Sequence, residues 1–118
     1  MDNKNFSLNF KDSGKITIVE FTGYLAAGVT EALVPRIEEL LVEGCRDFLF
    51  DFSGVTMLES AAVAGILATT EKIVDDRQGN LAFCKLNDVS RRVLEMVGVF
   101  LYAGCFDTSE QAIAEMSD

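Results

Sequence analysis

The sequence predicts an α/β fold: a mixed β-sheet with an N-terminal antiparallel hairpin, mainly parallel strands after it, and about four helices. Two short alternating segments joined by a turn predict the hairpin. Further along the chain, strand patterns alternate with helix patterns, which is typical of a parallel sheet with right-handed crossovers. At 118 residues the chain is long enough for one hydrophobic core, so we expect residues 1–118 to form a single domain.

Period-two alternation predicts the strands of the hairpin. Apolar and polar residues alternate over 6–10, and Asp-Ser-Gly at 12–14 has the composition of a turn. A second strand is expected over 15–21, paired with the first in antiparallel fashion. A loop over 23–28 then leads to the first helix.

Apolar residues at helical spacing predict the first helix, and Gly44 is expected to end it. Its apolar stripe consists of Leu33, Val34, Ile37, Leu40 and Leu41. Thr30 has the side chain of an N-cap, but Pro35 then lies just beyond the first turn, where it removes a backbone hydrogen bond. The helix therefore either begins one or two residues after Thr30 or is irregular near Pro35.

The segment 47–52 is the expected central strand, because its apolar residues would occupy both faces. A short loop at 53–56 follows, and then a second helix runs from about Ser60 to Asp76. A strand that passes through a loop into a helix places polar groups at the carboxyl edge of the sheet, where α/β proteins usually have their functional residues. Asp51 either is a functional carboxylate there or accepts hydrogen bonds from loop N–H groups.

The last third of the chain predicts two further strands and two further helices. In order, these are a strand over 81–86, a helix capped by Asp88 and stopped by Gly98, a short strand or extended segment over 100–106, and a last helix from the Thr108–Gln111 capping box to Met116. The residues of the third helix expected to face the core are Val89, Val93, Leu94 and Val97.

Charge and hydropathy restrict the partners and the compartment. Nineteen acidic and ten basic residues give a net charge of −9, which disfavours nucleic acid and anionic membrane surfaces as partners. No apolar run is long enough for a transmembrane helix, and the N-terminal residues lack the apolar segment of a signal peptide. We therefore expect a cytoplasmic protein with no direct membrane insertion. A homodimer is compatible with the sequence.

Little in the sequence points to catalysis. Histidine, the commonest general base and metal ligand, is absent. Cys45, Cys84 and Cys105 are far apart without C-x-x-C spacing, so we expect core thiols in a reducing compartment rather than a zinc or redox site. We expect no enzyme activity, no metal and no cofactor.

Three segments carry a resemblance to a known family. The segment 48–65 has the form of a buried strand, Asp, Ser-Gly-Val and an acidic-Ser helix start; 87–98 reads Asn-Asp-Val-Ser-Arg-Arg-Val-Leu-Glu-Met-Val-Gly; 106–112 reads Phe-Asp-Thr-Ser-Glu-Gln-Ala. In this order and spacing they resemble the STAS domain family, which includes the anti-sigma factor antagonists. The resemblance spans nearly the whole chain. It implies a single STAS-like domain with helices mostly on one face of the sheet.

The resemblance also implies a function in protein binding. In the antagonists, the domain binds an anti-sigma factor that is also a serine kinase, and the sigma factor is released. Phosphorylation of a serine at the start of the second helix then switches off binding. The family's Asp-Ser-Ser-Gly corresponds here to Glu59, Ser60, Ala61 and Ala62, so the usual phosphoserine position is Ala61. An alanine cannot carry a phosphate, which leaves Ser60, or Thr56, as a weaker candidate acceptor.

The docking surface is expected at 53–65, together with the edge formed by 23–28. The predicted partner-binding residues are Met57, Leu58, Glu59, Ser60, Ala61, Ala62 and Val63. For several of them a structural role is the alternative: Met57 and Leu58 could pack under the second helix, Ser60 could be its N-cap, and Glu59 could complement its dipole. The alternative function, favoured somewhat by Ala61, is a constitutive cytoplasmic subunit of a membrane transport ATPase or of a signalling scaffold.

Overall fold

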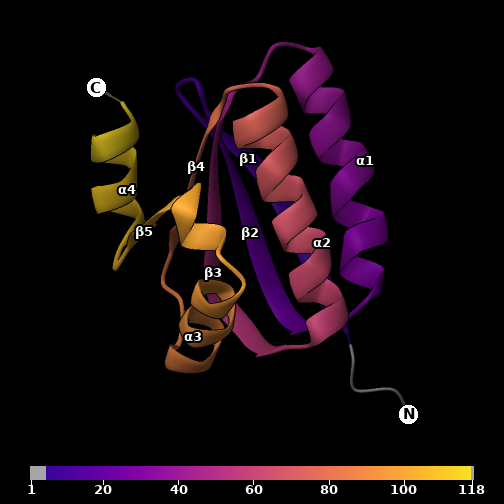
Figure 1. The fold of residues 1–118 in the computed structure, drawn as a ribbon. Coiled ribbons are helices and arrows are strands. Elements are labelled where there is room, and N and C mark those ends of the chain that lie inside the picture. The colour runs from indigo at the N-terminus through magenta and orange to yellow at the C-terminus, as the bar shows by residue number, and fades with distance from the viewer. Residues whose placement is uncertain (1–4, 118) are drawn as a thin grey trace.

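Five strands lie side by side in the order β1-β2-β3-β4-β5 in the computed structural model, which describes residues 5–117 (Figure 1). The elements are β1 (Phe6–Ser13), β2 (Ile16–Leu25), α1 (Gly28–Val42), β3 (Asp47–Leu58), α2 (Ser60–Glu71) with a π-helical extension (Lys72–Asp76), β4 (Asn80–Cys84), α3 (Asp88–Met96) with a 3-10 turn (Val99–Leu101), β5 (Gly104–Phe106) and α4 (Ser109–Met116). Only β1 and β2 pair antiparallel; the other neighbours are parallel. The predicted mixed sheet is confirmed.

The connectivity explains why three helices share one face of the sheet. Each parallel strand is followed by its immediate neighbour, always in the same direction across the sheet, so right-handed crossovers place α1, α2 and α3 on one side. The larger core cluster lies between these helices and the sheet. The chain crosses to the other face only after β5, where Ala112 of α4 covers a smaller cluster around Leu49 and Cys84 (Figure 1).

Aromatic side chains on the central strands fill the larger core. Phe50 of β3 lies edge-on to Phe21 of β2 at 5.1 Å and to Phe83 of β4 at 5.4 Å between ring centroids. Phe52 makes similar contacts one pleat further along β3. Because alternate residues of a strand point to the same face, Phe48, Phe50 and Phe52 all project towards the helices, as expected for a central strand.

Several element boundaries differ from the expectations. The predicted loop at 53–56 is strand, and so is the first half of the predicted loop at 23–28, because the ends of β2 and β3 continue to pair as far as Leu25 and Leu58. The first helix begins at Gly28 rather than at or after Thr30, and the buried Val29 belongs to its first turn. The helix runs unbroken through Pro35. β4 ends two residues early, where Lys85 adopts a positive φ of 60°.

The third helix and the cysteines also differ from the expectations. The N-cap is Asn87 rather than Asp88, and its Oδ1 accepts a hydrogen bond from the Ser90 N–H at 2.8 Å. Gly98 stops this helix as expected, with a φ of 89° that favours glycine. Of the three predicted core thiols, Cys84 is buried, but Cys45 is only half-buried and Cys105 is exposed on the edge strand.

Gly65 allows α1 and α2 to approach closely. A Cβ at this position would lie 1.9 Å from Thr30 Oγ1 and 2.8 Å from Thr30 Cβ. We expect Gly65→Ala to lower the free energy of unfolding by about 1–3 kcal/mol, because overpacking forces the two helices apart. Urea denaturation followed by circular dichroism measures the change. Adding Thr30→Ala removes the closest atom and should restore part of the loss; a double variant no more stable than Gly65→Ala alone would show that this contact is not the cause.

Candidate functional site

The carboxyl ends of β2 and β3 meet at the first turn of α2. Beyond Asp51, β3 continues beside β2 through two register shifts, which pair Tyr24 with Met57 and Leu25 with Leu58. Gly54 permits this close approach, because a Cβ there would lie 2.6 Å from Thr22 Cγ2. The extended pairing projects the end of β3 past the bulk of the sheet, so the turn into α2 stands at the rim of the molecule (Figure 1).

Glu59 joins the strand to the helix. Its backbone N–H donates to Leu25 O at 2.9 Å, and its carbonyl accepts from the N–H groups of Ala62 and Val63. Its side chain accepts a hydrogen bond at 2.5 Å from the Tyr24 hydroxyl, so it is directed towards the end of β2. Glu59, rather than Ser60, therefore holds the N-cap position, although its side chain makes no capping hydrogen bond.

The predicted partner-binding residues divide by exposure. Met57, Ser60 and Ala61 are exposed, and Glu59 is half-buried. Leu58, Ala62 and Val63 are buried in the larger core cluster. These three buried side chains pack the turn against the core. The surface available to a partner therefore consists of Met57, the outer edge of Glu59, Ser60 and Ala61.

The start of α3 lies beside this turn and extends the surface. A groove of about 150 Å³ is lined by Thr56, Met57 and Leu58 from β3 and by Asn87, Asp88, Val89 and Ser90 from α3. Met57 is 46% exposed and Val89, which was expected to face the core, is 62% exposed. Two large apolar side chains are therefore presented on opposite walls of one groove.

The position of Val89 follows from the face that α3 buries. Leu94 and the polar Ser90, four residues apart, point into the protein, while Val89 and Val97 point outwards. The sequence pattern suggested the opposite, because valine is more often buried than serine. The Asn87-x-x-Ser90 spacing contained the needed signal: once Asn87 is the cap, its hydrogen bond fixes Ser90 on the inner face of the first turn.

Asp51 was expected to be either a functional carboxylate or an acceptor for loop N–H groups, and the structure shows the second role. The side chain is buried, and its Oδ1 accepts a hydrogen bond from the Ser53 N–H at 2.9 Å. This contact directs the chain into the extended end of β3. Asp51 therefore supports the site without forming its surface.

Comparison with known proteins then identifies the family. A model of the STAS domain matches residues 7–112 of the chain. The chain belongs to the STAS domain family. A curated relative of this STAS domain, an anti-sigma F factor antagonist from Paenibacillus polymyxa, is 20% identical over 113 residues, or 95% of this chain and 96% of that protein.

Solved STAS structures are similar over almost their whole length. An anti-sigma factor antagonist from Mycobacterium paratuberculosis has a TM-score of 0.85 at 18% identity, covering 99% of this chain and 98% of that chain. The Bacillus cell fate determinant SpoIIAA in its phosphorylated form has a TM-score of 0.75 at 15% identity, covering 92% and 98%. These similarities confirm the fold class, including helices mostly on one face of a mixed sheet. Within residues 5–117 of the STAS domain, no helix is long and apolar enough to cross a bilayer.

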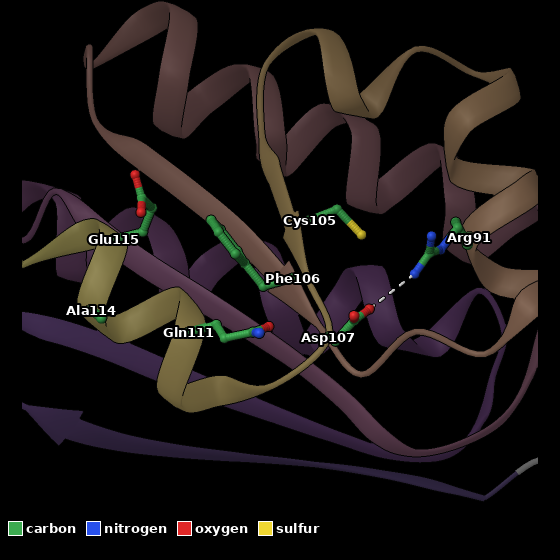
Figure 2. A pocket seen from close by; sticks show the side chains of 7 residues that line it. All are labelled: Arg91, Cys105, Phe106, Asp107, Gln111, Ala114 and Glu115. Carbon is green, nitrogen blue, oxygen red and sulfur yellow. Dashed lines mark ion pairs between the residues drawn. The ribbon is translucent and has the colours of Figure 1, made fainter.

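A second hollow of this STAS domain lies between α3, β5 and α4 (Figure 2). It measures about 540 Å³ and contains none of the predicted site residues. Arg91 and Asp107 form an ion pair at 3.5 Å across it, and the Cys105 side chain points into it (Figure 2). Although Cys105 is exposed as a residue, the protein partly desolvates its thiol and raises the pKa of that thiol, and burial raises the pKa of Cys84 to about 12. Both thiols are therefore protonated at neutral pH, which does not suit a nucleophile.

Proposed function

We propose that this STAS domain is a regulatory binding module of the anti-sigma factor antagonist type, which docks on an anti-sigma factor through the starts of α2 and α3. The observation that carries the proposal is the pair of exposed apolar side chains, Met57 and Val89, on either side of one groove. The relatives named as anti-sigma factor antagonists support the class of partner. Such a module acts in the cytoplasm by binding rather than by catalysis.

The chemistry of the surface suits a protein partner. A large exposed apolar side chain beside a groove is a typical anchor for an interface. Next to it, Ser60 and Ala61 are small, exposed and uncharged, so a partner can approach the first turn of α2 closely. The N–H groups of Ser60 and Ala61 lie at the positive end of the helix dipole, so they can donate hydrogen bonds to a carboxylate of the partner.

Ser60 is the hydroxyl that we assign to any phosphoswitch at this site. It is exposed at the first position of α2, directly before Ala61, which occupies the usual acceptor position. A phosphate on Ser60 would bring about −1.5 to −2 charges to the centre of the docking surface and oppose binding to an apolar or acidic partner. Without phosphorylation of Ser60 or Thr56, the module stays bound to its partner. Constitutive binding of this kind is also what the alternative function, a fixed subunit of a transport ATPase or scaffold, implies.

A pull-down with matched baits tests the proposal. The baits are the wild type, Met57→Lys and Val42→Lys; Val42 is 74% exposed on α1, away from the groove. From a lysate of the source cells, we expect the wild type and Val42→Lys to retain an anti-sigma factor. We expect Met57→Lys to lose it, because losing an interface anchor costs about 2 kcal/mol or more.

Repeating the pull-down with ATP separates the two modes of action. Release of the partner, with phosphate on Ser60 or Thr56 of the bait, would support a switch. Retention of the anti-sigma factor on an unmodified bait would support constitutive binding to the same partner. Recovery of a membrane transport ATPase or of a scaffold protein instead, with no anti-sigma factor on any bait, would overturn the proposed function.

A further inference from the structure

The outer edge of β1 is long and regular. β1 pairs with β2 in one unbroken register over its eight residues, without a bulge, a proline or a glycine. The opposite edge of the sheet, β5, is only three residues long. Natural proteins usually shorten, bend or cover an edge strand, because its unpaired N–H and C=O groups can pair with another chain. Within residues 5–117, β1 is thus neither short nor bent nor interrupted by a proline.

The register shows which backbone groups of β1 point outwards. The Tyr24 N–H donates to Asn5 O at 2.9 Å, so Asn5 belongs to a hydrogen-bonded pair with β2. In an antiparallel ladder such pairs alternate, which means that the odd-numbered residues of β1 bond to β2. The N–H and C=O groups of Phe6, Leu8 and Phe10 therefore point away from the sheet, in the plane of the strands.

The lysine of this edge strand is turned away from the edge. A lysine commonly protects an edge strand by projecting its charge outwards. Here Lys11 Nζ lies 2.8 Å from Glu20 Oε2 of β2, and Asn9 Nδ2 donates to Glu20 Oε1 at 2.8 Å. Both polar side chains are thus drawn inwards over the molecule's own sheet. Beside them, Phe6, Leu8 and Phe10 are half-exposed on the helical face.

We propose that two copies of this chain pair through β1 in antiparallel fashion, forming one continuous sheet across a two-fold axis at Leu8. In this register Leu8 faces Leu8 of the partner subunit, and Phe6 faces Phe10 of the partner subunit. Phe6, Leu8 and Phe10 of each copy then form about six backbone hydrogen bonds. Moving the axis to Asn9 would instead place Phe6 opposite Asp12 of the partner subunit, where the apolar ring has no apolar partner.

The charge of β1 makes this edge a less unfavourable place for a second copy than an acidic part of the surface. The whole chain carries −9, so two copies repel each other at most orientations. β1 contains one lysine and one aspartate and is neutral. Pairing through β1 therefore brings two acidic molecules together at a neutral segment, with no like charges directly opposite each other over residues 5–11.

The proposed dimer is independent of the docking surface but changes its valency. A two-fold axis perpendicular to the sheet reverses the strand direction of the second copy. The carboxyl ends of β3 in the two copies then point in opposite directions. Each dimer would present two docking surfaces at opposite ends of one sheet, and two linked partner molecules could be bound with an avidity that a monomer lacks.

Opposite charges at position 8 test the proposal. We expect the wild type to sediment as a dimer of two 12.9 kDa chains. Leu8→Lys and Leu8→Glu should each raise the dimer dissociation constant at least about tenfold, because like charges face each other across the axis. An equimolar mixture of the two variants should recover the dimer, since opposite charges then meet. Circular dichroism should show an unchanged fold, because Leu8 is half-exposed at an edge.

Controls at Val42 account for the altered net charge. Val42→Lys and Val42→Glu change the charge equally on the exposed side of α1 and should leave the wild-type dimer intact. A monomeric wild type at all concentrations would overturn the proposal and leave the edge to a strand of another protein or to solvent. A dimer that survives both Leu8 substitutions would also overturn it and place the interface elsewhere.

Discussion

Ala61→Glu and Ser60→Glu are each expected to abolish binding of the anti-sigma partner while leaving the fold intact. Both positions are exposed in the first turn of α2, so a longer side chain projects into the partner rather than into the core. A carboxylate near a helix N-terminus is favourable by about 0.3–1 kcal/mol, so the free energy of unfolding should hold or rise. Binding should fall at least about 100-fold, because a buried unpaired charge costs several kcal/mol.

Isothermal titration against the purified partner, together with urea denaturation, measures both quantities. Ala114→Glu provides a matched control: it makes the same change at an exposed alanine of α4, on the opposite face of the sheet. It should bind like the wild type. If Ala61→Glu and Ser60→Glu bind as tightly as Ala114→Glu, the docking surface lies elsewhere on the molecule.

Phe50→Ala is expected to lower the free energy of unfolding by about 3–5 kcal/mol. Phe50 is fully buried on the central strand, and its ring lies edge-on to both Phe21 and Phe83. Removing it opens a cavity and breaks two aromatic contacts in the middle of the larger core. For a small domain whose total stability is about 5–15 kcal/mol, this loss brings the protein close to unfolding at room temperature.

Chemical denaturation with circular dichroism and fluorescence readouts measures the loss. Phe50→Leu is the matched control, because it keeps most of the buried apolar volume and should cost much less than the alanine variant. A loss below about 1 kcal/mol for Phe50→Ala would mean that the surrounding side chains close the cavity. The three-ring contact would then not be the centre of the core.

Local patterns were sufficient for the order and type of the elements. Alternation over 6–10, the two-sided apolar segment at 47–52 and the Thr108–Gln111 capping box each specify an element through contacts within a few residues. The structure contains the box in both directions: Gln111 N–H donates to Thr108 Oγ1 at 3.1 Å, and Thr108 N–H donates to Gln111 Oε1 at 3.3 Å. The predicted docking segment also falls where the carboxyl ends of two parallel strands meet.

Exposure within the docking segment depended on neighbours far along the chain. Met57 and Leu58 are adjacent and chemically alike, yet only Met57 is exposed, because successive residues of a strand point to opposite faces. Val89 reached the same surface because Asn87 caps α3 and rotates Ser90 inwards. The extension of β3 depends on its pairing with β2. The composition of 53–56 is typical of a loop, so the sequence did not reveal this pairing.

The sequence by itself determined the α/β order of this STAS domain, its family and the segment that forms the proposed docking site. These follow from periodicity and spacing, which reflect interactions between residues close in the chain. Only the tertiary structure decided where strands continue, which member of an apolar pair is exposed, and why Gly65 must face Thr30. The physical reason is that burial and close packing depend on both elements of a contact. A sequence pattern describes one element and does not show which other element packs against it.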